Sequence, residues 1–164
     1  MRVALVITEL DVGGAEKCLT ELALHLHRAG VDVLVIGLGP KPIAPRDALH
    51  RQLESAGIPV RFLAANGSKD FFRAVRQLRS ELKQFAPDIV QSMLWHANVI
   101  SSWALRKLDV PLIGGVRVSE PRRLRHWIER NAAKRMARVV CVSDDVAATC
   151  RTRTGIPAEK IVVI

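Results

Sequence analysis

Short aliphatic runs alternate with amphipathic segments along this sequence, and the alternation restricts the fold more than any other feature. The runs RVALVI, at residues 2–7, and VDVLVIGL, at 31–38, lack regular polar alternation, as expected of strands buried on both faces. Between them, apolar residues recur at helical spacing until Gly30 ends the segment. A strand, a helix and a second strand in this order predict a parallel β–α–β unit.

The same pattern continues to the end of the sequence and predicts an α/β fold. We expect further strands at 59–63, 88–93, 111–116, 138–142 and 160–164, with helices at 47–56, 71–86, 96–108, 119–137 and 143–154. The prediction is one Rossmann-like domain, a doubly wound parallel sheet of about six to seven strands with helices on both faces. Because the sequence ends within a predicted strand, we expect it to be the front part of a longer protein.

Charge and cysteine content narrow the functional classes. The formal net charge is +9, which favours an anionic partner such as nucleic acid, an anionic membrane surface or a phosphorylated ligand. No apolar run approaches the roughly 18 residues of a membrane span. Glu9 and Asp11 interrupt the first apolar stretch, which is untypical of a signal peptide. The three cysteines have no C-x-x-C spacing, and we expect them to be reduced in the cytosol.

Polar residues and glycines follow several of the predicted strands. Ligands of open parallel sheets bind beyond the carboxyl ends of the strands, so these residues predict a sugar- or nucleotide-binding cleft. The candidates are Gly13, Gly14 and Glu16 after the first strand, Trp95, His96 and Asn98 after the fourth, Arg117 and Ser119 after the fifth, and Ser143 after the sixth.

Each candidate also has a plainer explanation. Gly13 and Gly14 favour a phosphate at the free N–H groups of a helix start, but a glycine pair also makes tight turns. His96 suits either a cleft or a helix cap, whereas a guanidinium at Arg117 is poorly explained by packing. Ser143 is most simply an N-cap. Neither the G-x-G-x-x-G fingerprint nor a P-loop nor D-x-D is present, and we expect no cofactor and no bound metal.

The predicted helix at 119–137, with Arg138 after it, is strongly basic. One interpretation is an amphipathic helix resting on anionic lipid, and the other is a solvated outer face. Nucleic acid is less favoured, because no aromatic residues are interleaved with the charges. The membrane-facing candidates are Arg122, Arg123, Arg125, Trp127, Arg130 and Lys134.

Four segments resemble family 4 glycosyltransferases, which are retaining enzymes of the GT-B fold. The opening VALVITELDVGGAEKCLTELALHLHRAGVDVLVIGL contains the GGAE that follows the first strand in that family. DIVQSMLWHANVISSWAL is similar to the W-M-x-H-A-[ND] pattern of a polysaccharide-building branch, and PLIGGVR to its G-[IV]-R. RVVCVSDDVAATCRTRTGIPAEKIVVI resembles the segment before the crossing into the second domain. Together the four matches span nearly the whole chain.

The resemblance implies that residues 1–164 form the N-terminal, acceptor-side domain of a two-domain enzyme. Gly13 and Gly14 would face the donor phosphates, with Glu16 opening the helix behind them, and His96 and Asn98 would line the acceptor side. Arg117 stands where relatives have a histidine near the transferred sugar. That histidine's role does not carry over to arginine, so the catalytic residues stay unassigned, with His96 and Arg117 as candidates.

The family's paired glutamates, E-x7-E, belong to the second domain, which this sequence lacks, so we expect these residues alone to be inactive. The leading hypothesis is a cytoplasmic enzyme that moves a sugar from a nucleotide-sugar to a glycan or lipid-linked acceptor, with peripheral contact to the inner face of the cell membrane left open. One alternative is a UDP-sugar epimerase of the same architecture. Another is a non-enzymatic basic α/β module that binds nucleic acid or anionic lipid.

Overall fold

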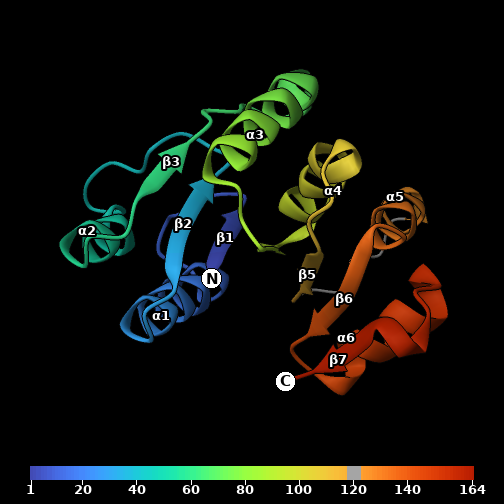
Figure 1. Ribbon diagram of the computed structural model, residues 1–164. Coiled ribbons are helices and arrows are strands. Elements are labelled where there is room, and N and C mark those ends of the chain that lie inside the picture. Colours follow the sequence, from blue (N-terminus) through green and yellow to red (C-terminus); the bar gives the residue numbers. More distant parts are fainter. Residues whose placement is uncertain (118–122) are drawn as a thin grey trace.

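The computed structural model describes residues 1–117 and 123–164. Its centre is a seven-stranded sheet in the order β3-β2-β1-β4-β5-β6-β7, in which every neighbouring pair is parallel (Figure 1). This confirms the predicted doubly wound α/β fold. The strands are β1 (Arg2–Ile7), β2 (Asp32–Gly37), β3 (Val60–Phe62), β4 (Ile89–Met93), β5 (Leu112–Val116), β6 (Met136–Cys141) and β7 (Ile161–Val163).

Helices cover both faces of the sheet. From β1 the chain winds outward to β3, then returns to β4 on the other side of β1, so the direction of winding reverses between β1 and β4. Helices α1 and α2 pack with one hydrophobic cluster, and α3 to α6 pack with the other. The helices are α1 (Gly14–Arg28), α2 (Ala48–Ser55), α3 (Phe71–Phe85), α4 (Trp95–Ala104), α5 (Arg123–Ala133) and α6 (Asp144–Thr149), with short turns η1 (Ser68–Asp70), η2 (Leu105–Lys107), η3 (Cys150–Thr154) and η4 (Ala158–Lys160).

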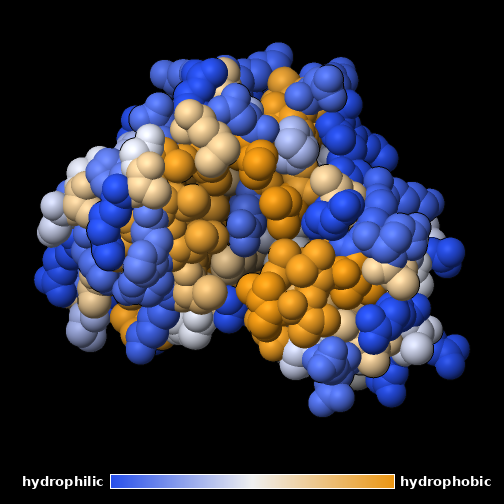
Figure 2. Space-filling model, turned by 60° about the horizontal axis from the view of Figure 1, so that its bottom comes forward, coloured by the Kyte–Doolittle hydropathy of each residue, from blue (hydrophilic) through white to orange (hydrophobic). Residues whose placement is uncertain are grey.

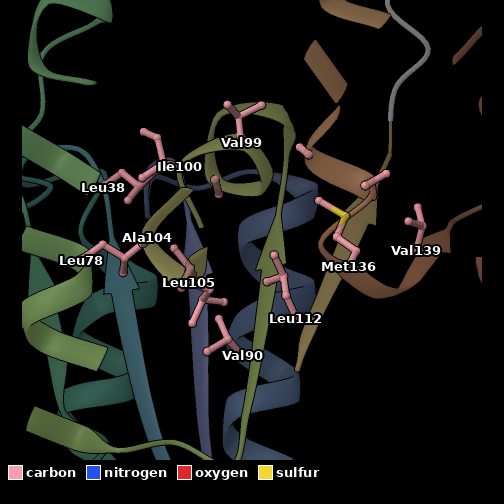
Figure 3. Close-up of a cluster of buried hydrophobic side chains, with 14 of the residues drawn as sticks. Leu38, Leu78, Val90, Val99, Ile100, Ala104, Leu105, Leu112, Met136 and Val139 are labelled. Atoms are coloured by element: carbon pink, nitrogen blue, oxygen red, sulfur yellow. The ribbon is translucent and has the colours of Figure 1, made fainter. Parts of the chain in front are cut away.

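Strand β1 lies at the centre of the core and explains the uninterrupted aliphatic runs. Its alternate residues face opposite sides of the sheet, and Leu5 packs under α1 and α2 while Val6 packs under the other layer. Both side chains are fully buried. Figure 3 shows part of this second cluster, to which α3 contributes Leu78 and β5 contributes Leu112. A strand covered on both faces has no exposed side on which polar residues would be favoured.

The predicted helix at 119–137 is wrong at its carboxyl end. Helix α5 ends at Ala133, and Met136 is the first residue of β6. The error arises because apolar spacing at Ile128, Ala132 and Met136 continues across a two-residue connection, so the sequence shows no break. Met136 instead packs over β5, where a Cβ at Gly114 would collide with its thioether. The proposed cap Ser119 and the basic candidate Arg122 lie outside the described residues.

The last part of the chain also differs in detail from the prediction. Instead of one helix at 143–154, α6 ends at Thr149 and a wider turn, η3, continues to Thr154.

Figure 2 shows hydrophobic atoms gathered in the middle of one face of the molecule, with hydrophilic groups around them. Val162 and Val163 of β7 and the following Ile164 are exposed.

Candidate functional site

A pocket of about 340 Å³, which we call the cleft, opens where the sheet reverses its winding. It lies beyond the carboxyl ends of three strands, and helices α1, α4 and α5 complete it. The contributing residues are Thr8 and Glu9 after β1, Glu16 from α1, Leu94, Trp95, His96 and Asn98 at and after the end of β4, Gly115, Val116 and Arg117 from the end of β5, and Arg125 and Glu129 from α5. This is the edge at which open parallel sheets bind ligands.

The structure therefore brings together five of the residues predicted from the sequence: Glu16, Trp95, His96, Asn98 and Arg117. His96 is exposed and Arg117 is partly buried. Proximity places these side chains within reach of one ligand. Their individual roles remain predictions.

Leu94, between β4 and α4, has an unusual backbone conformation. Its φ is 75° and its ψ is 156°, a region that normally only glycine occupies. Two backbone hydrogen bonds hold it: its N–H donates to the Gly115 carbonyl at 3.2 Å, and its own carbonyl accepts from the Asn98 N–H at 2.9 Å. Strain of this kind costs about 1–3 kcal/mol and persists only where neighbouring structure enforces it. The wall of the cleft is therefore held in one conformation.

Asn98 is part of the framework that enforces this conformation. Its side chain is 1% exposed, and its amide nitrogen donates to the Gly115 carbonyl at 3.0 Å. The Ser92 hydroxyl donates to its amide oxygen at 2.7 Å. Asn98 thus joins β4 to β5 beneath the cleft, and its amide atoms are engaged within the protein. A polar residue after a strand gives the right location, but its burial could not be read from the sequence.

Trp95, His96 and Arg125 form a stacked group on one wall. The rings of Trp95 and His96 meet edge to face, with centroids 5.0 Å apart. The Arg125 guanidinium carbon lies 5.0 Å from the centroid of the Trp95 ring, and the Trp95 indole N–H donates to the Arg125 carbonyl at 3.4 Å. Cation–π contact and this hydrogen bond connect α4 to α5.

Arg125 lines the cleft, whereas the sequence had left open whether this basic helix contacts a membrane or solvent. The reason is helical phase: at about 100° per residue, Arg125 and Glu129 lie on one side of α5, whereas Arg123, Trp127 and Arg130 lie on the opposite side. A count of basic residues along a helix does not show which of them face the cleft and which face the opposite side.

The glycine pair begins α1 beside the cleft. Gly13 is the extended N-cap residue, and a Cβ there would collide with the carboxylate of Glu16, which folds back over it. At Gly14 an added Cβ would meet nothing within 4 Å. The contact at Gly13 is with the end of a flexible side chain that can move, so packing within the described residues requires neither glycine.

Ser143 acts as a helix cap. Its hydroxyl accepts a hydrogen bond from the Val146 N–H at 3.3 Å, which satisfies one of the free donors at the start of α6. It is not among the described residues that line the cleft. Of the two interpretations drawn from the sequence, the structure supports the cap.

Sequence analysis missed Thr8, Glu9 and Glu129 as cleft residues. The first two follow β1 directly, so a complete inventory of strand ends would have included them. Glu129 was hidden within the basic helix, and its side chain is 9% exposed. Among the residues that the structure describes, no group of three His, Cys, Asp or Glu side chains could hold a metal ion.

A second depression, which we call the basic hollow, lies on the other side of α5. It has a volume of about 540 Å³ and is lined by Arg123, His126, Trp127, Arg130, Arg153 and Thr154.

Cys141 and Cys150 pack where η3 begins, as free thiols with sulfur atoms 3.8 Å apart. Burial raises the pKa of both thiols, so neither is a ready thiolate nucleophile.

Comparison with known structures identifies the architecture. HepE from Anabaena in complex with UDP-glucose is 21% identical with a TM-score of 0.80, and the match covers 100% of this chain and 43% of that one. A glycosyltransferase from Rickettsia africae is 19% identical with a TM-score of 0.75, covering 99% and 42%. UDP-N-acetylglucosamine 2-epimerase from Rickettsia bellii is 15% identical with a TM-score of 0.67, covering 99% and 44%.

These likenesses concern the fold, and this chain spans less than half the length of the three solved chains. Comparison with curated protein sequences gives no match. The model of the family named Glycosyltransferase Family 4 matches residues 12–164, which include nearly the whole sheet and every cleft residue that follows β4 and β5. The chain belongs to glycosyltransferase family 4.

Proposed function

We propose that this chain is the acceptor-side domain of a retaining glycosyltransferase, which moves a sugar from a nucleotide-sugar donor to a glycan or lipid-linked acceptor in the cytoplasm. The observation that carries the proposal is the cleft at the point where the sheet reverses, with two arginines and several carboxylates around one opening. Similar folds in complex with UDP and with UDP-glucose support a nucleotide-sugar as donor.

The charges of the cleft suit a reaction in which a diphosphate leaves. Arg117 and Arg125 supply guanidinium groups, which bind phosphate oxygens in a fixed forked geometry. Negative charge grows on the leaving diphosphate in the transition state, so nearby fixed cations lower the barrier. The carboxylates of Glu9 and Glu16 can accept hydrogen bonds from sugar hydroxyls.

The start of α1 supplies a second feature for an anion. Its first N–H groups carry the positive end of the helix dipole. The open space at Gly14 leaves that end accessible. The Glu16 carboxylate lies over Gly13, so an approaching diphosphate would have to displace it. We therefore assign Gly13 and Gly14 to the donor phosphates, with Glu16 as the group that moves aside.

A second, donor-binding domain is required by this proposal, and the isolated chain is expected to be inactive. One open wall cannot exclude water from the reacting sugar or surround the leaving group. Incubation of this chain with UDP-sugars and glycan acceptors should leave the donors intact, as followed by release of UDP. Turnover by the chain alone would contradict the proposal that catalysis requires a second, donor-binding domain.

The full-length protein provides the decisive test. We expect transfer of sugar to an added acceptor with retention of anomeric configuration, measured by mass spectrometry and NMR of the product. Arg117→Ala should lower kcat/KM at least about tenfold, because a charge-assisted contact to phosphate is lost. Arg28→Ala, which removes an exposed arginine at the end of α1, is the matched control and should leave kcat/KM unchanged.

An epimerase is the second candidate, because a UDP-sugar epimerase shares the fold. It would convert a UDP-sugar into its epimer without any acceptor, and the product would keep its nucleotide. Acceptor-independent epimer formation by the full-length protein would replace the transferase proposal.

A further inference from the structure

The basic hollow contains three positive charges from two separate elements. Arg123 and Arg130 come from α5, and Arg153 comes from η3. All three side chains are exposed, and none has an ion-pair or hydrogen-bond partner among residues 1–117 and 123–164. Some other arginines, such as Arg73 and Arg79, are engaged with carboxylate or carbonyl oxygens, whereas Arg76 is exposed like those of the hollow. The guanidinium groups of the hollow are therefore available to an external anion.

The floor and rim of the hollow are built by specific contacts. His126 and Thr154 are 9% and 4% exposed, and their side chains meet at 3.0 Å between Nδ1 and Oγ1, which joins α5 to η3. Gly155 follows with a φ of 71°, and a Cβ there would lie 3.5 Å from the guanidinium carbon of Arg130. Arg130 therefore lies beside the chain that follows η3. Two elements far apart in sequence are thus held at a defined separation beneath the arginines.

Two large apolar side chains stand beside the charges. Trp127 is 66% exposed and lines the hollow, and Leu124, three residues earlier on α5, is 68% exposed. An exposed indole next to arginines is typical of proteins that rest in the interfacial layer of a bilayer, where the ring lies among headgroups. A soluble phosphorylated ligand would not account for the exposed leucine.

We propose that the basic hollow binds the phosphate of an acidic phospholipid headgroup and holds the domain on a membrane surface, with Trp127 and Leu124 entering the interfacial layer. This placement leaves the cleft free, because Arg125 and Glu129 lie on the opposite side of α5. No described helix is long and apolar enough to cross a bilayer. The proposed attachment does not depend on the transfer reaction.

Vesicle flotation of this chain tests the proposal. We expect partitioning onto mixed phosphatidylcholine–phosphatidylglycerol vesicles and none onto phosphatidylcholine alone. Each basic residue near an acidic bilayer contributes roughly a fivefold factor, so the triple variant Arg123→Gln, Arg130→Gln, Arg153→Gln should lower the partition coefficient by about a hundredfold. The triple change to lysine keeps the charge and should retain most of the binding. Circular dichroism verifies that each variant is folded.

The matched control removes the same charge elsewhere. Arg28, Arg76 and Lys83 are exposed and lie outside the hollow, and their triple change to glutamine should lower partitioning far less than the hollow variant does. A second readout locates the contact: quenching of tryptophan fluorescence by brominated acidic lipid should be largely lost in Trp127→Phe. The remaining Trp95 and Trp103 lie outside the hollow.

The possible results separate cleanly. Equal losses in the two triple glutamine variants would overturn the proposal, because the attraction would then reflect net charge alone. Absence of binding to acidic vesicles, with salt-dependent binding of polynucleotide, would overturn it in favour of nucleic acid. Thermal stabilisation by glycerol 1-phosphate without vesicle binding would also overturn it, in favour of a soluble phosphate. Hollow-specific loss together with Trp127-dependent quenching supports it.

Discussion

The cleft and the basic hollow share α5 but hold their side chains in different ways. In the cleft, Asn98 is buried and doubly hydrogen-bonded, Leu94 is kept in a strained conformation, and Arg125 is stacked on Trp95. In the hollow, the arginines extend into solvent above a small polar floor. Fixed groups suit one bound geometry, as catalysis requires, whereas exposed cations without a described partner suit a surface that is itself variable. The difference predicts where substitutions cost stability and where they cost only binding.

The largest effect on stability is expected for Asn98→Ala. The change leaves the buried Ser92 hydroxyl without its partner and removes one of the two donors to the Gly115 carbonyl, so the free energy of unfolding should fall by about 2 kcal/mol. Urea unfolding followed by circular dichroism measures it. Asn131→Ala on exposed α5, whose side chain bonds only at the surface, is the control, with a change below about 0.5 kcal/mol. Equal losses would erase the distinction between the two regions.

Alkaline pH should lower the free energy of unfolding through the two buried thiols that pack at the start of η3. Burial raises the pKa of Cys141 and Cys150, so above about pH 8.5 the unfolded chain releases protons that the folded chain keeps. This stabilisation is fully present below the unfolded pKa and is lost as pH rises, by at most about 1.4 kcal/mol per pH unit for each thiol.

Urea unfolding across this pH range measures the effect, and the double change Cys141→Ala, Cys150→Ala should flatten it. The sequence has no tyrosine, which removes one competing titration. Cys18→Ala, in α1, should keep the dependence. If the free energy of unfolding of the double variant falls with pH as steeply as that of the unchanged chain, these two thiols are not the cause of the pH dependence.

Gly14→Ala, beside the cleft, should have opposite effects on stability and on ligand binding. Alanine is the better helix former, and its Cβ would enter open space, so stability should stay constant or rise by up to about 1 kcal/mol. If the donor phosphates approach here, as proposed, the full-length protein should bind UDP more weakly. Thermal melting and calorimetric titration measure the two quantities. Unchanged affinity for UDP would remove Gly14 from the proposed phosphate site.

The smallest effect is expected for the hollow. Replacement of Arg123, Arg130 and Arg153 by glutamine should change the free energy of unfolding by less than about 0.5 kcal/mol, because no described partner is lost. The urea midpoint, compared with that of Asn98→Ala, gives the contrast directly. A loss comparable to that of Asn98→Ala would mean that the hollow is a structural element.

The fold was predictable because its strands are buried on both faces, which leaves continuous aliphatic runs that loops and helices interrupt. The cleft's location was predictable too, since strand ends of a parallel sheet meet at one edge. The roles of individual side chains were harder to predict. Asn98 and Ser143 look alike in sequence, as polar residues after strands, yet one joins two strands and the other caps a helix. Neither the strained Leu94 nor the partner of Met136 leaves a local signal.

Helix α5 carries the cleft on one side and the hollow on the other, and the separation depends only on angular phase. A single inserted residue near its start would rotate everything before the insertion by about 100° relative to the rest of the helix. Arg123 would then leave the hollow while Arg130 stayed, although both arginines would still be present in the sequence. A point substitution in α5 can therefore change one site alone. An insertion or deletion within its three turns would disturb both sites at once.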